Sequence, residues 1–423
     1  MHFIVPLLCL LAVLFPGCVS SKKVQENESV FRNSFYETKL SNGIPVILKQ
    51  NTSPGPAAVI LVIDGGAALI PSDMGGIEWL TLCLIRRQSG AEEFREVTFP
   101  DYATYGYVSD MGTVLDKLKI LAESFISPSV DEAAFGAVMA EAKEEMARQN
   151  ASGPERFAEA VKKRLYEGHP YFTSVHLTES LMRSVTVSDL KACHDSLVNA
   201  ARLKIIAVGN FDDYSAAQFV LAAETTFRKV EQASFTVPLM SAVKTAAGDS
   251  VLPLIMPAED KYLVGCFTVP SYKDADYIPF ALATLYFDDM LKHSIKERNQ
   301  AAESAGTGLF IAKQPVGVIS VYKARDTAEC KKLVLSAIRD FPDRLAVDKF
   351  LNQYKGEYIR RLVSSSAASD REAAQLAASD EYFDDPQAYT KRSALVNSVT
   401  AIQVEAAFRK YISEKNIHWY SVN

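Results

Sequence analysis

The order of apolar and polar residues separates a short leader from a long folded region. An almost unbroken apolar stretch runs from Ile4 to Phe15; it is too short to span a bilayer but has the length of a signal-peptide core. A polar stretch follows it, and from about Phe35 apolar residues recur with the periods of strands and helices. We therefore expect a signal peptide over residues 1–18 and a tether over residues 19–34.

The first half of the folded region has strand patterns followed by helix patterns. Thr38–Gln50 has a strand–turn–strand pattern in which Leu40-Ser41-Asn42-Gly43 supplies the turn. Ala57–Ile63 is a short, β-branched run typical of a central strand. Helical patterns then cover residues 74–87, 131–150 and 154–166. This order predicts an α+β sandwich in which helices cover one face of a sheet.

The same pattern occurs twice. Ser184-Val185-Thr186 begins a segment that ends in the strand-like run Leu203–Gly209, and Ser398-Val399-Thr400 begins a segment that ends at Asn423. The two segments align without a gap, and each reads as a Thr-capped amphipathic helix followed by a buried strand. We predict two tandem homologous α/β sandwich domains over residues 35–230 and 249–423, joined by a linker over residues 231–248.

Composition fits this organisation and excludes one class of function. A chain of 423 residues exceeds the size at which a single hydrophobic core stops growing. The hydrophobic share of 48% is typical of a folded soluble protein. The net charge of −6 is spread along the chain without a run of Lys and Arg, so we expect no nucleic-acid partner.

The cysteines point to export and not to a disulfide framework. Cys18 follows Pro16-Gly17 at the end of the apolar leader, an arrangement that resembles the cleavage site of bacterial lipoproteins. Lipidation at Cys18 would anchor the chain to a membrane of the bacterial cell envelope, on its periplasmic or surface face. An ordinary secretory signal or a simple N-terminal anchor is the alternative. The later cysteines are far apart and form no Cys-x-x-Cys pair, so neither a small disulfide scaffold nor a zinc knuckle is expected.

Several motifs, in order, resemble the insulinase/pitrilysin family of zinc peptidases, which includes the mitochondrial processing peptidase. They are the Leu40–Gly43 start, Val138-Met139-Ala140-Glu141, Gly168-His169-Pro170-Tyr171 and the segment that ends at Gly209. The resemblance covers nearly all of the chain from Phe35. It implies the metallohydrolase fold of that family, in which duplicated units form a clam-shell chamber around an extended polypeptide.

The zinc signature of that family, His-x-x-Glu-His, is replaced in this chain. Its two histidines lie one helical turn apart and bind one zinc ion, while the glutamate activates the bound water. Here Glu78 stands at the first histidine position, Thr81 at the general-base position and Leu82 at the second histidine position. No histidine occurs between His2 and His169, so no shift of alignment restores the site. We expect no zinc cofactor and no peptidase activity.

Two further family positions retain polar residues. Glu141 stands where the family has its third zinc ligand, and we interpret it as a solvated residue within an acidic–basic helix. In the second unit, Lys296 and Arg298 are candidates for the family's substrate-binding arginine, but no tyrosine follows them before Tyr322.

The resemblance therefore implies a pseudo-peptidase of the cell envelope. It would bind peptides or pair with an active peptidase subunit, as a homodimer or a heterodimer. One alternative is an active zinc metalloendopeptidase whose altered site uses Glu78 and Glu141. The other alternative is a purely structural envelope lipoprotein.

Overall fold

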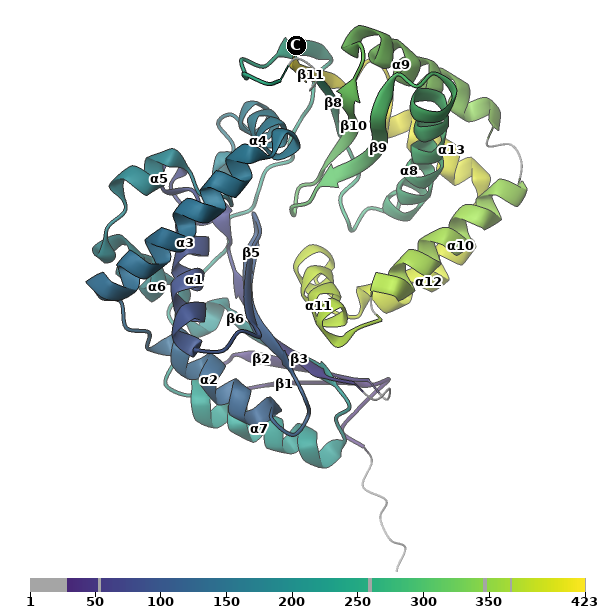
Figure 1. Ribbon diagram of the computed structural model, residues 1–423. Coiled ribbons are helices and arrows are strands. Elements are labelled where there is room, and N and C mark those ends of the chain that lie inside the picture. Colours follow the sequence, from purple (N-terminus) through teal and green to yellow (C-terminus); the bar gives the residue numbers. More distant parts are fainter. Residues whose placement is uncertain (1–28, 52–54, 258–260, 345–347, 366, 423) are drawn as a thin grey trace, which may run out of the picture.

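The computed structural model describes residues 29–51, 55–257, 261–344, 348–365 and 367–422. The predicted signal peptide, Cys18 and the tether as far as residue 28 lie outside the described residues. Two units are visible, each with one sheet and several helices (Figure 1). No helix in the described ranges is long and apolar enough to cross a membrane.

The first unit contains a six-stranded sheet in the order β1-β2-β6-β3-β5-β4. Neighbouring strands are antiparallel except β2 and β6, which are parallel. The predicted turn is present, and Gly43 supplies its positive φ of 89°. The strands are β1 (Phe35–Lys39), β2 (Pro45–Gln50), β3 (Ala57–Asp64), β4 (Phe94–Thr98), β5 (Tyr102–Ser109) and β6 (Leu203–Gly209).

The helices of the first unit follow the predicted order. The predicted segments 74–87, 131–150 and 154–166 correspond to α1, α3 and α4, with their ends displaced by up to three residues. The full set is α1 (Ile77–Ser89), α2 (Val114–Ile126), α3 (Glu132–Ala151), α4 (Gly153–Leu165), α5 (Glu179–Ser184), α6 (Val187–Leu197) and α7 (Asp213–Phe227).

The second unit repeats this plan around a five-stranded sheet in the order β7-β11-β8-β10-β9. Its strands are β7 (Gly248–Val251), β8 (Tyr262–Thr268), β9 (Ala302–Phe310), β10 (Val316–Ala324) and β11 (His418–Val422). Its helices are α8 (Tyr277–Leu291), α9 (Thr327–Arg344), α10 (Asp348–Ser365), α11 (Ser369–Phe383), α12 (Ala388–Ser398) and α13 (Ala401–Tyr411), with a π-helical turn at Lys292–Arg298.

The internal repeat is visible at the level of single hydrogen bonds. Thr186 caps α6 and Thr400 caps α13, each through a capping box with the residue three positions later. Strand β6 follows α6, and β11 follows α13, and each lies between two other strands of its sheet. The α+β fold predicted from the sequence is thereby confirmed.

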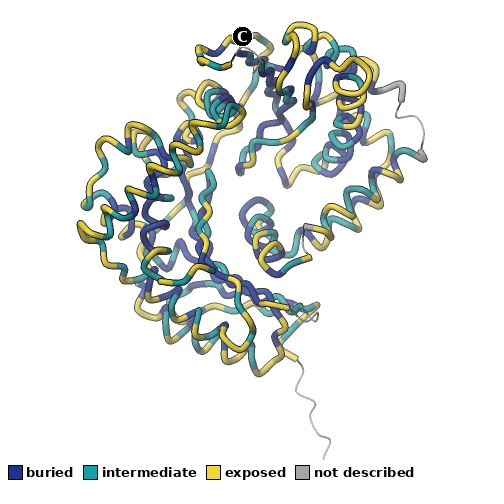
Figure 2. The backbone as a smooth tube through the Cα atoms, in the orientation of Figure 1, coloured by how far each residue is buried: buried dark blue, intermediate teal, exposed yellow. Residues whose placement is uncertain are grey.

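Each unit contributes one helix that packs on the sheet of the other unit. Helix α11 of the second unit packs through Ala373, Leu376 and Ala377 on the face of the first sheet that its own helices leave open. In return, α4 of the first unit packs through Phe157 and Val161 on the second sheet. Both faces of each sheet are therefore buried (Figure 2). The prediction of helices over one face only was wrong, because the repeat alone does not reveal which sheet a helix covers.

The segment between the units contains no helix or strand from residue 231 to residue 247. It nevertheless packs against the fold, because Met240 and Val243 are buried in the same cluster as α4 and the second sheet.

Candidate functional site

The degenerate site lies on helix α1, whose start is held in place by Gly76. Gly76 caps the helix with a φ of 92°, and a Cβ at this position would lie 2.7 Å from the carbonyl oxygen of His176. Only glycine fits this close approach without displacing the 176–177 backbone. From this start, α1 turns one side toward α6 and another toward α3 and the edge strand β4.

Glu78 lies on the side that faces α6. Its carboxylate is buried, and neither of its oxygens has a hydrogen-bond donor among the described residues. The nearest cation is Arg202, whose Nη2 is 4.0 Å from Glu78 Oε1. Burial raises the pKa of Glu78 to about 7, although the charge of Arg202 opposes this shift. Glu78 is therefore a carboxyl group close to its titration point near neutral pH.

Thr81 and Leu82, at the other two positions of the lost signature, are buried in the packing of the first unit. Thr81 is buried and donates its hydroxyl hydrogen bond to the carbonyl oxygen of Ile77, at 2.9 Å. This bond to the preceding turn is a common arrangement for a threonine within a helix. Leu82 is completely buried in the core of the first unit. Neither residue offers a group that could take a proton from water.

Glu141 lies on α3 and faces a different side of α1. Arg86 donates a short hydrogen bond to it, and Arg87 Nη1 donates a second bond at 3.1 Å. Burial alone would raise the pKa of Glu141, but hydrogen bonds from Cys83 and Arg87 and the charge of Arg86 outweigh it and keep the pKa below its usual value. Glu141 was interpreted from the sequence as a solvated helix residue; its side chain is 30% exposed, and two arginines from α1 also hold it.

Arg86 provides the positive charge at the centre of this contact. Besides Glu141, its Nε lies 2.8 Å from Oε2 of Glu96 on strand β4. Burial raises the pKa of Glu96 even so. Burial, together with the neighbouring carboxylates, raises the pKa of the Cys83 thiol to about 12. Cys83 is therefore a neutral thiol between α1 and α3.

The positions that face Glu141 are thus one residue later than the sequence indicated. Cys83 contacts Glu141, and Trp79, one turn earlier, faces Glu145 one turn later on α3. Glu78 and Glu141 meet different neighbours on different sides of α1, which contradicts a metal site built from both. The residues replacing the two histidines are, by this geometry, Trp79 and Cys83. Within the described ranges, no group of three or more His, Cys, Asp or Glu side chains could hold a metal ion.

A cavity of about 200 Å³ lies beside Trp79. It is lined by β4 residues, by Glu145 and Gln149 of α3, and by the segment 175–177. His176 reaches Gln149, with 3.4 Å between Nδ1 and Nε2. Burial lowers the pKa of His176, so this ring is neutral at physiological pH. A groove of about 560 Å³ along α3 and α4 adjoins the cavity and shares Gln149, His176 and Leu177 with it.

Sequence reasoning missed three parts of this site: strand β4, Glu145 and the cavity side of Trp79. The run Phe94–Thr98 is too short and too polar to stand out as a strand. One signal in the sequence could have indicated this site. Trp79, Cys83 and Arg86 are spaced four and three residues apart and therefore lie on one face of α1.

The candidates in the second unit are not built into a site of this kind. Lys296 and Arg298 lie on the π-helical turn, and both side chains are exposed. Tyr322, the next tyrosine, packs edge-on against Tyr262 of β8 at 5.4 Å.

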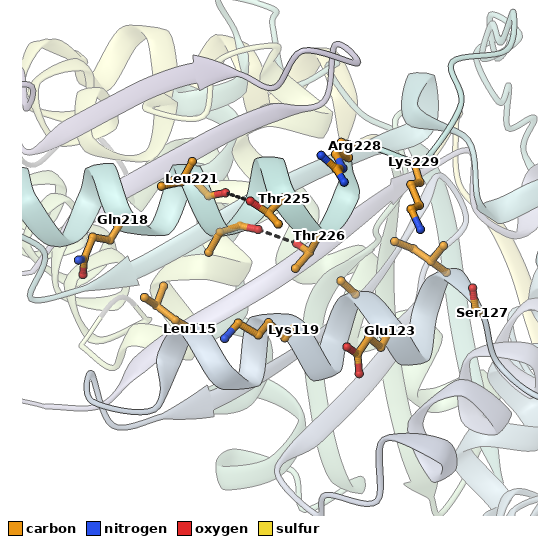
Figure 3. Close-up of a pocket in the computed structure, with 13 residues that line it drawn as sticks. Leu115, Lys119, Glu123, Ser127, Gln218, Leu221, Thr225, Thr226, Arg228 and Lys229 are labelled. Carbon is orange, nitrogen blue, oxygen red and sulfur yellow. Dashed lines mark hydrogen bonds between the residues drawn. The ribbon is translucent and has the colours of Figure 1, made fainter.

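Another hollow, of about 810 Å³, lies between α2 and α7 (Figure 3). Leu115 and Leu221 line it, with Lys119 and Lys229 among the polar residues. It contains no residue of α1, α3 or β4 and no nucleophile or general base arranged for chemistry. We therefore do not assign it a role in the degenerate site.

Residues 184–350 match the family model of the peptidase M16 inactive domain. None of the curated proteins compared with the chain matches its sequence. A protease from Helicobacter pylori has the same fold, with a TM-score of 0.81 and 14% identity over 92% of this chain and 99% of that chain.

Two more solved structures are similar. The peptidase M16 inactive domain from Pseudomonas fluorescens has a TM-score of 0.77 and 17% identity, over 92% of this chain and 97% of that chain. The periplasmic protease PqqL from Escherichia coli has a TM-score of 0.75 and 16% identity, over 98% of this chain but 48% of that chain. The chain therefore has the fold of M16 peptidases, and residues 184–350 match the inactive-domain model of that family, in agreement with the insulinase/pitrilysin resemblance of its sequence.

Proposed function

We propose that this chain is a non-catalytic M16 homologue that binds an extended polypeptide in the bacterial cell envelope. The observation that carries this proposal is the contact between α1 and α3. Trp79 and Cys83 stand on the face toward Glu141, and Arg86 and Arg87 neutralise that carboxylate. A zinc ion needs several deprotonated ligands that converge on it. Here the ligand types are absent and the remaining carboxylate already has cationic partners.

Strand β4 is the surface that would take the polypeptide. It is an edge strand of the first sheet and, among the described residues, pairs with β5 on one side only. An extended peptide adds to such an edge through main-chain hydrogen bonds and places alternate side chains in adjoining pockets. The cavity beside Trp79 adjoins β4 at Glu96, Val97 and Thr98. This mode of binding needs no metal ion.

Anchoring and pairing complete the proposal. Lipidation at Cys18 would hold the chain at the membrane of the envelope, and an active peptidase subunit or a second copy would be its partner. The chain spans about half the length of PqqL. A pair of such chains would therefore have the length of that single protein.

The first experiment measures zinc in the purified full chain by mass spectrometry, alongside two engineered variants that also carry Arg86→Met to remove one of the two arginines that hold Glu141. One variant combines Trp79→His, Leu82→Glu and Cys83→His; the matched control combines Glu78→His, Thr81→Glu and Leu82→His. We expect far less than one equivalent in the native chain and about one equivalent in the first variant only. Stoichiometric zinc in the native chain, with peptide cleavage abolished by Glu141→Ala, would overturn the proposal.

Peptide binding can be followed through tryptophan fluorescence, since the chain has only two tryptophans. Trp79 lines the cavity, whereas Trp419 is buried on β11. A peptide at the β4 edge should change the emission of the native chain and leave the emission of a Trp79→Phe variant unchanged. If no member of a diverse panel of extended peptides changes the emission at millimolar concentration, the alternative of a purely structural lipoprotein is favoured.

A further inference from the structure

A separate cavity lies in the second unit, between the loop that precedes α8 and helix α12. Its volume is about 480 Å³. Three aromatic rings meet in its wall, two from the region around the start of α8 and one from the end of α11. Tyr272 lies 5.2 Å from Tyr277 and 5.4 Å from Phe383, and Tyr277 lies 5.7 Å from Phe383, as measured between ring centroids. This wall offers a large, rigid apolar surface to a ligand.

Arg392 of α12 is the distinctive polar residue of the cavity. Its guanidinium carbon lies 4.2 Å from the centroid of the Phe383 ring, so the aromatic face fixes the group. Nη2 has a long bond of 3.4 Å to Ser379 Oγ, and the Tyr358 hydroxyl is a second polar neighbour of the guanidinium. Nε is buried and has no hydrogen-bond acceptor among the described residues. A buried donor without an acceptor is costly, and it is commonly satisfied by a ligand or by water.

The other charged groups that line the cavity are already engaged. Lys391 pairs with Asp385, which also accepts a hydrogen bond of 3.0 Å from the backbone N–H of Gln387. Lys273 pairs with Asp384, and Asp274 accepts from the backbone N–H of Asp276 at 2.9 Å. In the described part of the chain, Arg392 is thus the cation of this cavity for which no carboxylate partner is found within ion-pair distance.

We propose that this cavity binds a carboxylate that is joined to an apolar body. Arg392 takes the carboxylate, because the planar guanidinium presents parallel donors that match the two carboxylate oxygens. The rings of Tyr272, Tyr277 and Phe383 take the apolar part. Two sources supply this chemistry, namely the C-terminus of a peptide with an apolar last residue and a free aliphatic acid. The proposal does not depend on the site at α1.

The test is calorimetric titration of the full chain with three probes. They are N-acetyl-Ala-Ala-Phe with a free carboxylate, the same peptide as its C-terminal amide, and decanoate. We expect the free acid to bind at least about tenfold more tightly than the amide, as a charge-assisted hydrogen-bond pair predicts. Tighter binding of the peptide acid than of decanoate indicates a peptide terminus as the ligand, and the reverse order indicates a free acid.

Variants separate a specific site from general charge attraction. Arg392→Gln should remove the preference for acid over amide, and Arg392→Lys should retain part of it. Lys391→Gln, which alters a paired cation on the same helix, should keep the preference within about twofold. Circular dichroism establishes whether each variant is folded, and the lysine variant carries the test if the glutamine variant is not. Equal binding of acid and amide, no binding of any probe at millimolar concentration, or an unchanged preference in both Arg392 variants would overturn the proposal. None of these results would alter the Trp79 emission experiment.

Discussion

Glu78 and Glu141 are carboxylates that the sequence assigns to one ancestral metal site, yet the structure gives them opposite surroundings. Glu78 is buried against α6 with no hydrogen-bond donor in the described structure and only a distant arginine. Glu141 receives hydrogen bonds from two arginines of α1. The comparison shows that the position of a residue in a motif does not determine the pKa or the charged partners of its side chain. These depend on the helix or strand that packs against it.

The two carboxylates should therefore affect stability with opposite pH dependence. The raised pKa of Glu78 means that its folded form keeps a proton that the unfolded chain has lost, so its contribution declines as pH rises toward 7. The lowered pKa of Glu141 means that its contribution is present above the unfolded pKa and is lost as pH falls through the folded value. Each of the following changes alters one side of this contrast.

The largest effect is expected from Arg86→Met. This change keeps the length and apolar stem of the side chain but leaves both Glu96 and Glu141 without their shared cation. Uncompensated carboxylates in a half-buried contact should lower the free energy of unfolding by about 4 kcal/mol at pH 7. Urea titration measures this loss. The loss should shrink at pH 4, where the carboxylates take up protons; an equal loss at both pH values would contradict the assigned role.

Glu78→Gln should act in the opposite direction. Glutamine has the same shape but no charge, so the variant avoids the cost of ionising a buried carboxyl. The stability of the variant relative to the native chain should rise by roughly 3 kcal/mol between pH 4.5 and pH 8, because the pKa of Glu78 moves from its usual 4.5 to about 7. Thermal unfolding across that range tests it. A difference that does not change with pH would show that Glu78 is not the titrating group.

Arg87→Met should have the smallest effect and serves as the control for Arg86. Arg87 also donates to Glu141, but it is more exposed than Arg86 and touches no second carboxylate in the described structure. We expect a loss below about 1 kcal/mol, which high salt reduces further. A loss as large as that of Arg86→Met would mean that the ion pairs of Glu141 alone stabilise the packing of α1 against α3. The contact of Arg86 with both Glu96 and Glu141 would then have no additional effect.

The sequence by itself determined the features that neighbouring residues encode. The internal repeat, the helix starts at Thr186 and Thr400, the strand Ala57–Ile63 and the loss of the histidines all follow from local patterns. Helix and strand periods depend on residues two to four positions apart, and a capping box spans three. Such features can therefore be predicted before any tertiary contact is known.

Only the tertiary structure decided which groups meet. Arg86 and Glu141 are 55 residues apart, and α4 and α11 each cover the sheet of the other unit. The side chains of α1 that face α3 are Trp79 and Cys83, each one residue later than the positions Glu78 and Leu82 expected from the sequence. This difference depends on how α3 packs against α1. The aromatic cavity around Arg392 likewise joins segments more than 100 residues apart. Contacts of this range are set by how whole elements pack, because no local pattern records which side of a helix its distant neighbour will cover.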